Sequence, residues 1–269
     1  MVLLTCAAAA LAIIPLVAIL GYLVQQGADA LSLEFFTNTP RPVGEPGGGM
    51  ANAIVGTLIL LGIASAVGLP VGIGAGLYLA ERGGSRLAEL VRFVSDVLNG
   101  LPSIVMGIFA WQFLVRPVGH FSALAGGAAI GAMMIPLVTR TTEEMVRTVP
   151  PSLREAALAL GYPRWRTSLQ IVLRSALGGI VTGVLVAVAR VAGETAPLLF
   201  TAFGNQFWST QVTQPIAALP LQVFVYAISP YDEWHAQAWA GALVLVGLVL
   251  VISVLARFAV RSRHGRAND

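Results

Sequence analysis

Runs of about twenty apolar residues recur along this chain, and they limit its fold more than any other feature. Inside lipid every backbone polar group must be satisfied within the protein, so a spanning segment of roughly 20 apolar residues forms a helix. Such segments are predicted at residues 5–25, 52–80, 93–115, 122–139, 176–200 and 237–257. Only 11% of the residues are charged, whereas soluble domains have about 25%. The sequence therefore predicts an all-α integral membrane protein with six transmembrane helices.

The arginines predict how these helices are oriented. All sixteen basic residues are arginine, and thirteen of them fall in the loops 81–92 and 140–174 and in the tail after residue 256. The loops on the opposite side hold only Arg41 and Arg116. Because cytoplasmic loops carry an excess of basic residues, both termini are expected in the cytoplasm. The first segment is interpreted as an uncleaved helix, since it lacks the basic start of a signal peptide and its apolar run is too long.

This pattern divides the chain into three parts. Residues 1–50 are expected to hold the first transmembrane helix and an extracytoplasmic loop, residues 51–257 a transmembrane core with a cytoplasmic loop at 140–174, and residues 258–269 a cytoplasmic tail. Glycines four residues apart allow close contact between helices. They occur within the predicted spans at Gly72/Gly76, Gly127/Gly131 and Gly179/Gly183.

The composition argues against several kinds of site. A P-loop needs a lysine to reach the nucleotide phosphates, and the chain has none, so any ATP is expected on a partner subunit. Cys6 is the single cysteine, which rules out an intrachain disulfide. The three histidines are far apart in sequence, so no metal site or cofactor is expected. The net charge of +3 gives no reason to expect nucleic-acid binding, because the arginines lie in membrane-flanking loops.

The cytoplasmic loop carries a helical segment with a sharp corner. Ser152 and Glu155 have the spacing of a capping box, and Gly161 is expected to end the helix that they begin. Helices shorter than about 12–15 residues are marginal in water, so this one needs packing partners. It either folds back on its own transmembrane helices or docks on a cytoplasmic subunit.

The segment "EAALALGYPRWRTSLQIVL" resembles the EAA loop of ATP-binding-cassette (ABC) importer permeases. In that family the loop sits in a groove of the ATPase and passes the closure of the ATPase to the transmembrane helices. The resemblance assigns this role to Glu155, Ala156, Ala157 and Gly161, with Ile171 and Leu173 completing the motif. The proline that often follows this leucine in the family is replaced by Arg174.

Other segments narrow the resemblance. "NGLPSIVMGIF" at 99–109, "IPLVTRTTEEMVRTVP" at 135–150 and "ARVAGETAPLLF" at 189–200 are similar to phosphate importer permeases of the PstA type. The resemblance implies a type I, MetI-like ABC permease fold in the cytoplasmic membrane of a bacterium or archaeon. It also implies a transport subunit without its own ATPase site. The implied partners are a homologous permease (in a heterodimer), two copies of an ATP-binding subunit, an extracytoplasmic phosphate-binding protein and the lipid bilayer.

Arg190 and Glu194 are the only charged residues between Ser175 and Tyr231. Four positions apart on a helix, they would share one face, and a charge inside a membrane is costly unless it faces a partner or a polar cavity. One interpretation is an internal salt bridge. The other is a substrate pathway in which Arg190 binds a phosphate-like anion through paired hydrogen bonds and Glu194 weakens that binding enough for release. In the resembled family this arginine and glutamate are implicated in transport.

Three further features of the predicted membrane region bear on the role of this pair. Gly193 and Pro197 predict a break or bend in the helix that carries it, as at many transporter substrate sites. Arg140 at the cytoplasmic end of the fourth span is either a membrane-flanking anchor or, as the resemblance allows, a cytoplasmic exit contact. Asp96 is expected to cap a helix or to bond to a neighbouring helix rather than to bind substrate.

Three alternative functions compete with phosphate import. A permease for another oxyanion, such as sulfate or molybdate, would use the same arginine. A secondary transporter with Glu194 as a proton relay would work without an ATPase, but it leaves the EAA loop unexplained. An intramembrane enzyme is disfavoured because the sequence offers no nucleophile–base pair and no metal cluster.

Overall fold

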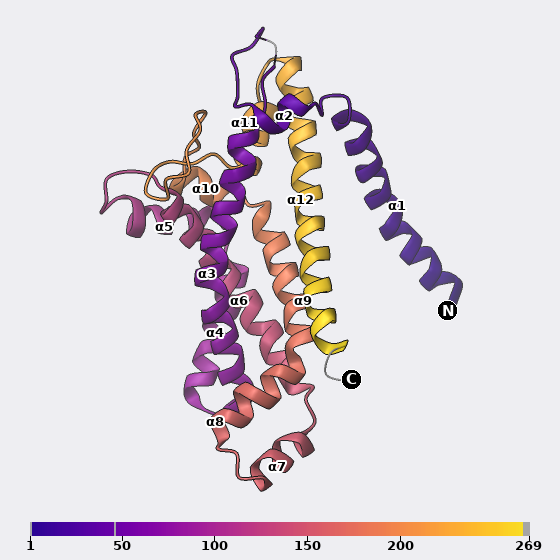
Figure 1. Cartoon of the computed structure of the whole chain (residues 1–269), viewed down its shortest axis with the longest axis vertical. Coiled ribbons are helices and arrows are strands. Elements are labelled where there is room, and N and C mark those ends of the chain that lie inside the picture. The colour runs from indigo at the N-terminus through magenta and orange to yellow at the C-terminus, as the bar shows by residue number, and fades with distance from the viewer. Residues whose placement is uncertain (1, 46, 266–269) are drawn as a thin grey trace.

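The computed structural model describes residues 2–45 and 47–265, and most of them belong to helices (Figure 1). The long helices are α1 (Val2–Gly27), α3 (Ala51–Glu81), α6 (Ala123–Arg147), α9 (Leu173–Ala192) and α12 (Asp232–Gly265). The shorter ones are α2 (Leu33–Thr37), α4 (Arg86–Gly100), α5 (Ser103–Ala110), α7 (Pro151–Ala159), α8 (Arg164–Arg166), α10 (Ala196–Thr201) and α11 (Leu219–Ala227). Two π-helical turns, Trp111–Val115 and Thr167–Val172, extend α5 and lead into α9.

Within the described residues, four helical stretches are long and apolar enough to cross a membrane: α3, α6, Arg164–Ala192 and Asp232–Phe258. A fifth span results if α4 and α5 are counted together. Helix α1 has 26 residues and is apolar over Ile13–Gly27, and it leans away from the others (Figure 1). The multi-pass helical architecture is confirmed, whereas the number of six spans stays a prediction.

The predicted third span, 93–115, is wrong as a single straight helix. The chain bends by 107° between α4 and the segment Ser103–Val115. Pro102 has no backbone N–H to donate, and the residue before a proline avoids the helical conformation. Leu101 accordingly adopts an extended conformation with φ −72° and ψ 135°. As a result α4 runs along the bundle while α5 lies across it (Figure 1).

The predicted fifth span, 176–200, is also interrupted, as Gly193 and Pro197 suggested. Helix α9 ends at Ala192 with Gly193 as its C-cap, and the short α10 begins at Ala196 with Pro197 in its first turn. Both α5 and α10 lie to the same side of the bundle (Figure 1), and they pack together. At Gly107 a side chain would come 2.9 Å from the Cα of Pro197. The two interrupted helices therefore meet where their short segments cross.

Helices α3 and α6 pack closely and run in the same direction. A side chain at Gly68, Gly72 or Gly76 of α3 would collide with Met134, Val138 or Thr142 of α6, respectively. These contacts advance by four residues along both helices, which makes the pair parallel and in register. The glycine spacing noted at Gly72/Gly76 is thus confirmed as a close helix contact. Of the four apolar spans, α6 is the most enclosed, with 61% of its window buried against 17% for α12.

Helix α9 packs against α6 in the opposite direction. A side chain at Gly183 would collide with Thr141, and one at Gly179 with Met145. The main core cluster fills the space between α3, α6 and α9 with residues such as Leu60, Ile130, Val138, Val188 and Val191. The chain between α6 and α9, including α7 and α8, projects beyond the lower end of the bundle in Figure 1.

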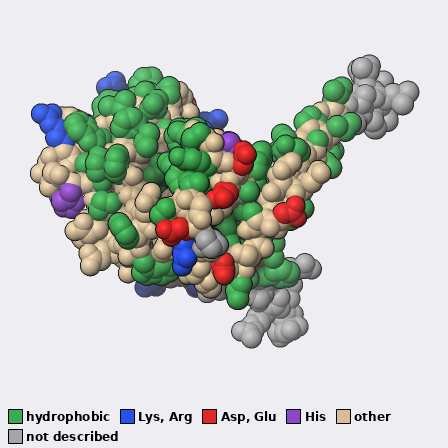
Figure 2. Space-filling model, turned by 90° about the horizontal axis from the view of Figure 1, so that it is seen from above, with side chains coloured by type: hydrophobic (Ala, Val, Ile, Leu, Met, Phe, Trp, Pro, Cys, Tyr) green, Lys and Arg blue, Asp and Glu red, His purple; other side chains and the backbone are tan. Residues whose placement is uncertain are grey.

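Seen from the opposite end, where α2, α11 and the start of α12 lie, the molecule shows acidic side chains near the base of α1 (Figure 2). The segments at this end hold Asp29, Glu34, Glu45, Asp232 and Glu233. The two ends of the bundle therefore differ in charge, since the loops 81–92 and 140–174 carry most of the arginines. The last four residues of the predicted tail, 266–269, lie outside the described part of the chain.

Candidate functional site

Arg190 and Glu194 flank the break between α9 and α10. Arg190 lies in the last turn of α9 with an exposed side chain, and Glu194 lies in the break itself and is partly exposed. Among the ion pairs formed by residues 2–45 and 47–265, none joins these two side chains. Because the helix ends between them, the spacing of four no longer places them on one helical face. The internal salt bridge considered from the sequence is therefore absent from this part of the chain.

The backbone at the break is held by neighbouring elements. The Thr195 hydroxyl donates to the carbonyl oxygen of Pro220 in α11 at 3.4 Å. In α10 the Thr201 hydroxyl donates to the Pro197 carbonyl at 2.7 Å, and this hydroxyl is buried. The Thr195 bond to α11 and the packing of α5 on Pro197 thus hold the break from outside, whereas the Thr201 bond lies within α10.

Arg140 lies on α6, closer than Arg190 to the end that carries the arginine-rich loops. The next residue of α6, Thr141, faces Gly183 on α9. Arg190 is seven positions beyond Gly183, which is about two helical turns or about 10 Å along the axis on the same face. The structure therefore places the two arginines on adjacent helices at different depths, and it does not bring them into contact.

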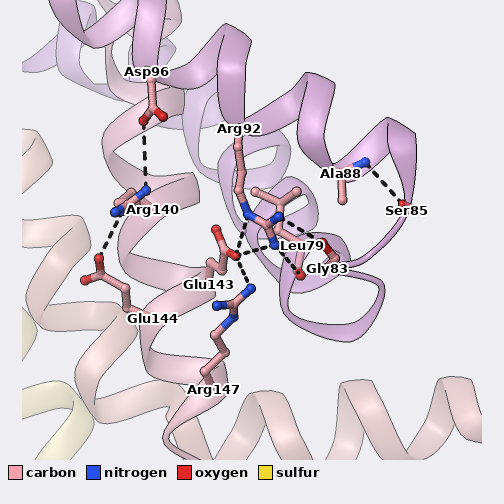
Figure 3. Close-up of polar contacts among 10 residues, drawn as sticks. All are labelled: Leu79, Gly83, Ser85, Ala88, Arg92, Asp96, Arg140, Glu143, Glu144 and Arg147. Carbon is pink, nitrogen blue, oxygen red and sulfur yellow. Dashed lines mark hydrogen bonds and ion pairs between the residues drawn. The ribbon is translucent and has the colours of Figure 1, made fainter.

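Two carboxylates contact the guanidinium of Arg140. One belongs to Glu144, one turn along α6, at 3.0 Å, and the other to Asp96 on α4, at 3.9 Å (Figure 3). All three side chains are more than half exposed. Asp96 thus forms an ion pair with a neighbouring helix, at a distance too long for the hydrogen bond that was expected.

Beside Arg140 lies a more buried ion cluster that the sequence did not reveal. Glu143 on α6 is only 6% exposed, and its Oε1 accepts from Arg92 of α4 at 2.8 Å and forms an ion pair with Arg147 of α6 at 2.7 Å (Figure 3). The four-residue spacing of Glu143 and Arg147 was visible in the sequence. Arg92 was not linked to them, because it is 51 positions away from Glu143. A polar cavity of about 440 Å³ is lined by Arg92, Arg140, Glu143, Glu144 and Arg147.

The EAA-like loop lies at the lower end of the bundle, away from the α9–α10 break (Figure 1). In α7, Ala157 is buried, whereas Glu155 and Ala156 are exposed. The expected capping box is wrong: the helix starts at Pro151, its N-cap is Pro150, and no side chain caps it. A proline already supplies the helical φ at the first position and has no N–H to cap there.

The end of α7 agrees with the sequence. Gly161 has a φ of +82°, a left-handed conformation that glycine adopts without strain. The N–H of Gly161 donates to Leu158 O at 3.0 Å, and the N–H of Tyr162 donates to Ala157 O at 3.1 Å. The corner after Gly161 leaves Leu160 79% exposed, so an apolar side chain stands at the outermost part of the loop.

Comparison with known proteins agrees with this geometry. The family described as "Binding-protein-dependent transport system inner membrane component" matches residues 72–264. The phosphate transport system permease protein PstA of Yersinia pestis is 51% identical over 87% of this chain and 80% of its own length. A probable phosphate transport system permease protein PstA of Methanocaldococcus jannaschii is 38% identical over 93% of this chain and 89% of its own.

Solved structures support the fold. A permease chain in an inward-facing form of the MetNI methionine ABC transporter superposes with a TM-score of 0.62, at 21% identity, over 79% of this chain and 96% of that one. The overall helical fold is thus one that a solved transporter structure also has. The chain belongs to the family of binding-protein-dependent transport system inner membrane components, as do the PstA permeases, and is a transport component rather than an enzyme.

Proposed function

We propose that this chain is a transmembrane permease subunit of an ATP-driven importer that carries inorganic phosphate into the cytoplasm. The observation that carries this proposal is the high identity, over most of both chains, to proteins named as phosphate transport system permeases. The arginines on α6 and α9 support it chemically, because a guanidinium binds a phosphate oxyanion through two parallel hydrogen bonds and stays charged.

The proposed complex contains a homologous permease in a heterodimer, two copies of an ATP-binding subunit and an extracytoplasmic phosphate-binding protein. Both termini and the EAA-like loop face the cytoplasm. This orientation is supported by the excess of arginine in the loops 81–92 and 140–174. Glu155, Ala156 and Gly161 contact the ATP-binding subunit, with the buried Ala157 packed beneath them, and the exposed apolar residues of the loop form part of that contact.

In the proposed pathway, Arg190 meets the anion in the membrane and Arg140 meets it nearer the cytoplasm. Exposure of Arg190, which has no ion-pair partner within the described residues, supports this role. In this proposal Glu194, four residues further along the chain, weakens the binding of the anion, because like charges repel. An arginine without that neighbour would release phosphate more slowly.

Phosphate uptake into vesicles that contain the whole complex tests this function. Arg190→Gln is expected to lower uptake by about tenfold or more, because a hydrogen bond to a charged group is worth about 1.5–3 kcal/mol. ATP hydrolysis and assembly should persist. Arg116→Gln is the matched control, since Arg116 is an exposed arginine whose guanidinium bonds to Gln112 of its own segment.

The substrate is tested in the same vesicles by competition. Excess unlabelled phosphate should abolish uptake of labelled phosphate, whereas sulfate and molybdate should leave it unchanged. Inhibition by sulfate at equal concentration would favour a different oxyanion. Uptake that continues without ATP and stops on addition of an uncoupler would favour a secondary transporter.

A further inference from the structure

Arg92 joins three elements at the arginine-rich end of the bundle. From α4, its Nε and Nη2 donate to Glu143 Oε1 of α6 at 2.9 and 2.8 Å. Its Nη1 donates to the carbonyl oxygen of Gly83 at 2.9 Å, and its Nη2 also approaches that of Leu79 at 3.3 Å (Figure 3). Leu79 lies in the last turns of α3, and Gly83 in the turn that follows. One guanidinium therefore fixes α4 to the ends of both α3 and α6.

Arg154 makes the corresponding link for the EAA-like loop. From α7, its Nη1 lies 3.4 Å from Glu81 Oε1 at the end of α3. Its Nη2 donates to the carbonyl oxygen of Val146 near the end of α6 at 3.2 Å. The short helix α7 is thus tied to the same two helix ends as α4.

Between these two links lies a pair of helices that resists deformation. Gly68, Gly72 and Gly76 of α3 lie directly against α6, and close-packed interiors transmit displacement instead of absorbing it. A force on α7 therefore reaches the ends of α3 and α6 through Arg154, and it reaches α4 through Arg92. No comparable polar link joins α7 to α9 within the described residues, although α7 and the turn before α9 pack together.

We infer that Arg92, held by Glu143, is a positioning residue that couples the ATPase-facing helix α7 to α4, and so to the bend between α4 and α5. This inference rests on the proposed function, since coupling requires an ATP-driven permease. The bend matters because α5 packs against α10 at Pro197, next to the break that carries Glu194. Movement of α4 is therefore transmitted through α5 to α10, which lies beside the proposed pathway.

The test compares two arginines that share one carboxylate. Arg92→Gln removes the link between helices, whereas Arg147→Gln removes an ion pair to the same Glu143 oxygen from within α6. In proteoliposomes with the whole complex, Arg92→Gln should lower the ratio of phosphate transported to ATP hydrolysed by about tenfold. Arg147→Gln should leave that ratio within about twofold of the unchanged complex. Equal ratios for both variants would overturn the inference.

A second readout does not depend on the transported ion. Val97 on α4 is 45% exposed, and in a Cys6→Ser chain the variant Val97→Cys provides a single thiol. Its rate of labelling by a maleimide should change when the ATPase subunits bind ATP, and Arg92→Gln should abolish that change while Arg147→Gln retains it. A labelling rate that does not respond to ATP when Arg92 is intact would also overturn the inference.

Two further outcomes separate the inference from the proposed function. If the complex moves no phosphate but the thiol responds to ATP through Arg92, the proposed substrate is wrong and the coupling role stands. If Arg92→Gln does not assemble, Arg92→Lys keeps the charge but cannot reach all three acceptors at once. Arg92→Lys should give a ratio of phosphate transported to ATP hydrolysed that lies between that of the unchanged complex and that of an uncoupled complex. A ratio equal to that of the unchanged complex would contradict the coupling role.

Discussion

Gly161 adopts a backbone conformation that other residues reach only with strain, and it does so at the corner of the proposed ATPase contact. Its φ is +82°, and no atom lies within 4 Å of where a side chain would begin. Gly161→Ala should therefore cost about 1–2 kcal/mol through the backbone alone, because an L-residue is disfavoured in the left-handed region. We expect lower uptake per assembled complex, measured in vesicles.

The control for this prediction is Gly84→Ala. Gly84 lies in the turn between α3 and α4, also has open space around it, and has no positive φ. Its replacement should leave uptake near that of the unchanged complex. Equal losses for both variants would show that the conformation at Gly161 is not what matters.

Glu194 has a different predicted effect, on release instead of folding. If it weakens phosphate binding at Arg190, Glu194→Gln should lower both the apparent KM and the maximal rate of uptake, since tighter binding slows departure. Initial rates over a range of phosphate concentrations give both quantities. A raised KM with an unchanged maximal rate would contradict this role.

At the scale of single residues, the sequence singled out Arg190, Glu194 and Arg140 as candidates but gave no sign of the Arg92–Glu143 cluster. An isolated charge in an apolar run stands out without any knowledge of the fold. Arg92 instead resembled an ordinary membrane-flanking arginine, one of three in the loop 81–92. Its contact with Glu143 depends on the packing of α4 against α6, which the sequence pattern does not predict.

Among the elements, close contacts between helices carry the most specific predictions. A side chain at Gly183 of α9 would collide with Thr141 of α6. Gly183→Ala should therefore destabilise the protein by about 1–3 kcal/mol, as overpacking of a filled interior does. A lower unfolding temperature of the purified complex in detergent is the expected measurement.

Two variants check the cause of that loss. Gly178 lies on an exposed part of the same helix with nothing within 4 Å, so Gly178→Ala should be tolerated. Adding Thr141→Ser to Gly183→Ala removes a methyl group at the contact and should recover part of the stability. Independent, additive losses in the double variant would mean that the two residues do not meet.

Hydrophobic runs predicted where helices exist, whereas breaks in them depend on individual residues. A straight helix and two helices joined by a bend give the same apolar run, so hydropathy alone does not distinguish them. The break after Ala192 was expected because glycine and proline occur together around a charged pair. Pro102 produced a bend of 107° that was not expected, since prolines are tolerated inside many membrane helices.

For the whole molecule, the predicted orientation can be tested with single thiols in a Cys6→Ser chain. Phe207 is 79% exposed in the loop between α10 and α11, and Gly84 lies in the turn after α3. A maleimide that cannot cross membranes should label Phe207→Cys in intact cells. It should label Gly84→Cys only after the membrane is permeabilised, and the reverse pattern would invert the proposed topology.

The parallel packing of α3 and α6 has an electrostatic consequence at the end of the bundle where both helices have their C-termini. Helix dipoles that point the same way add, so two helix C-termini place a combined partial charge of about −1 side by side. The guanidinium of Arg92 binds carbonyl oxygens at and just beyond the end of α3, and that of Arg154 binds one near the end of α6. These two arginines therefore neutralise part of the field that the parallel helices create.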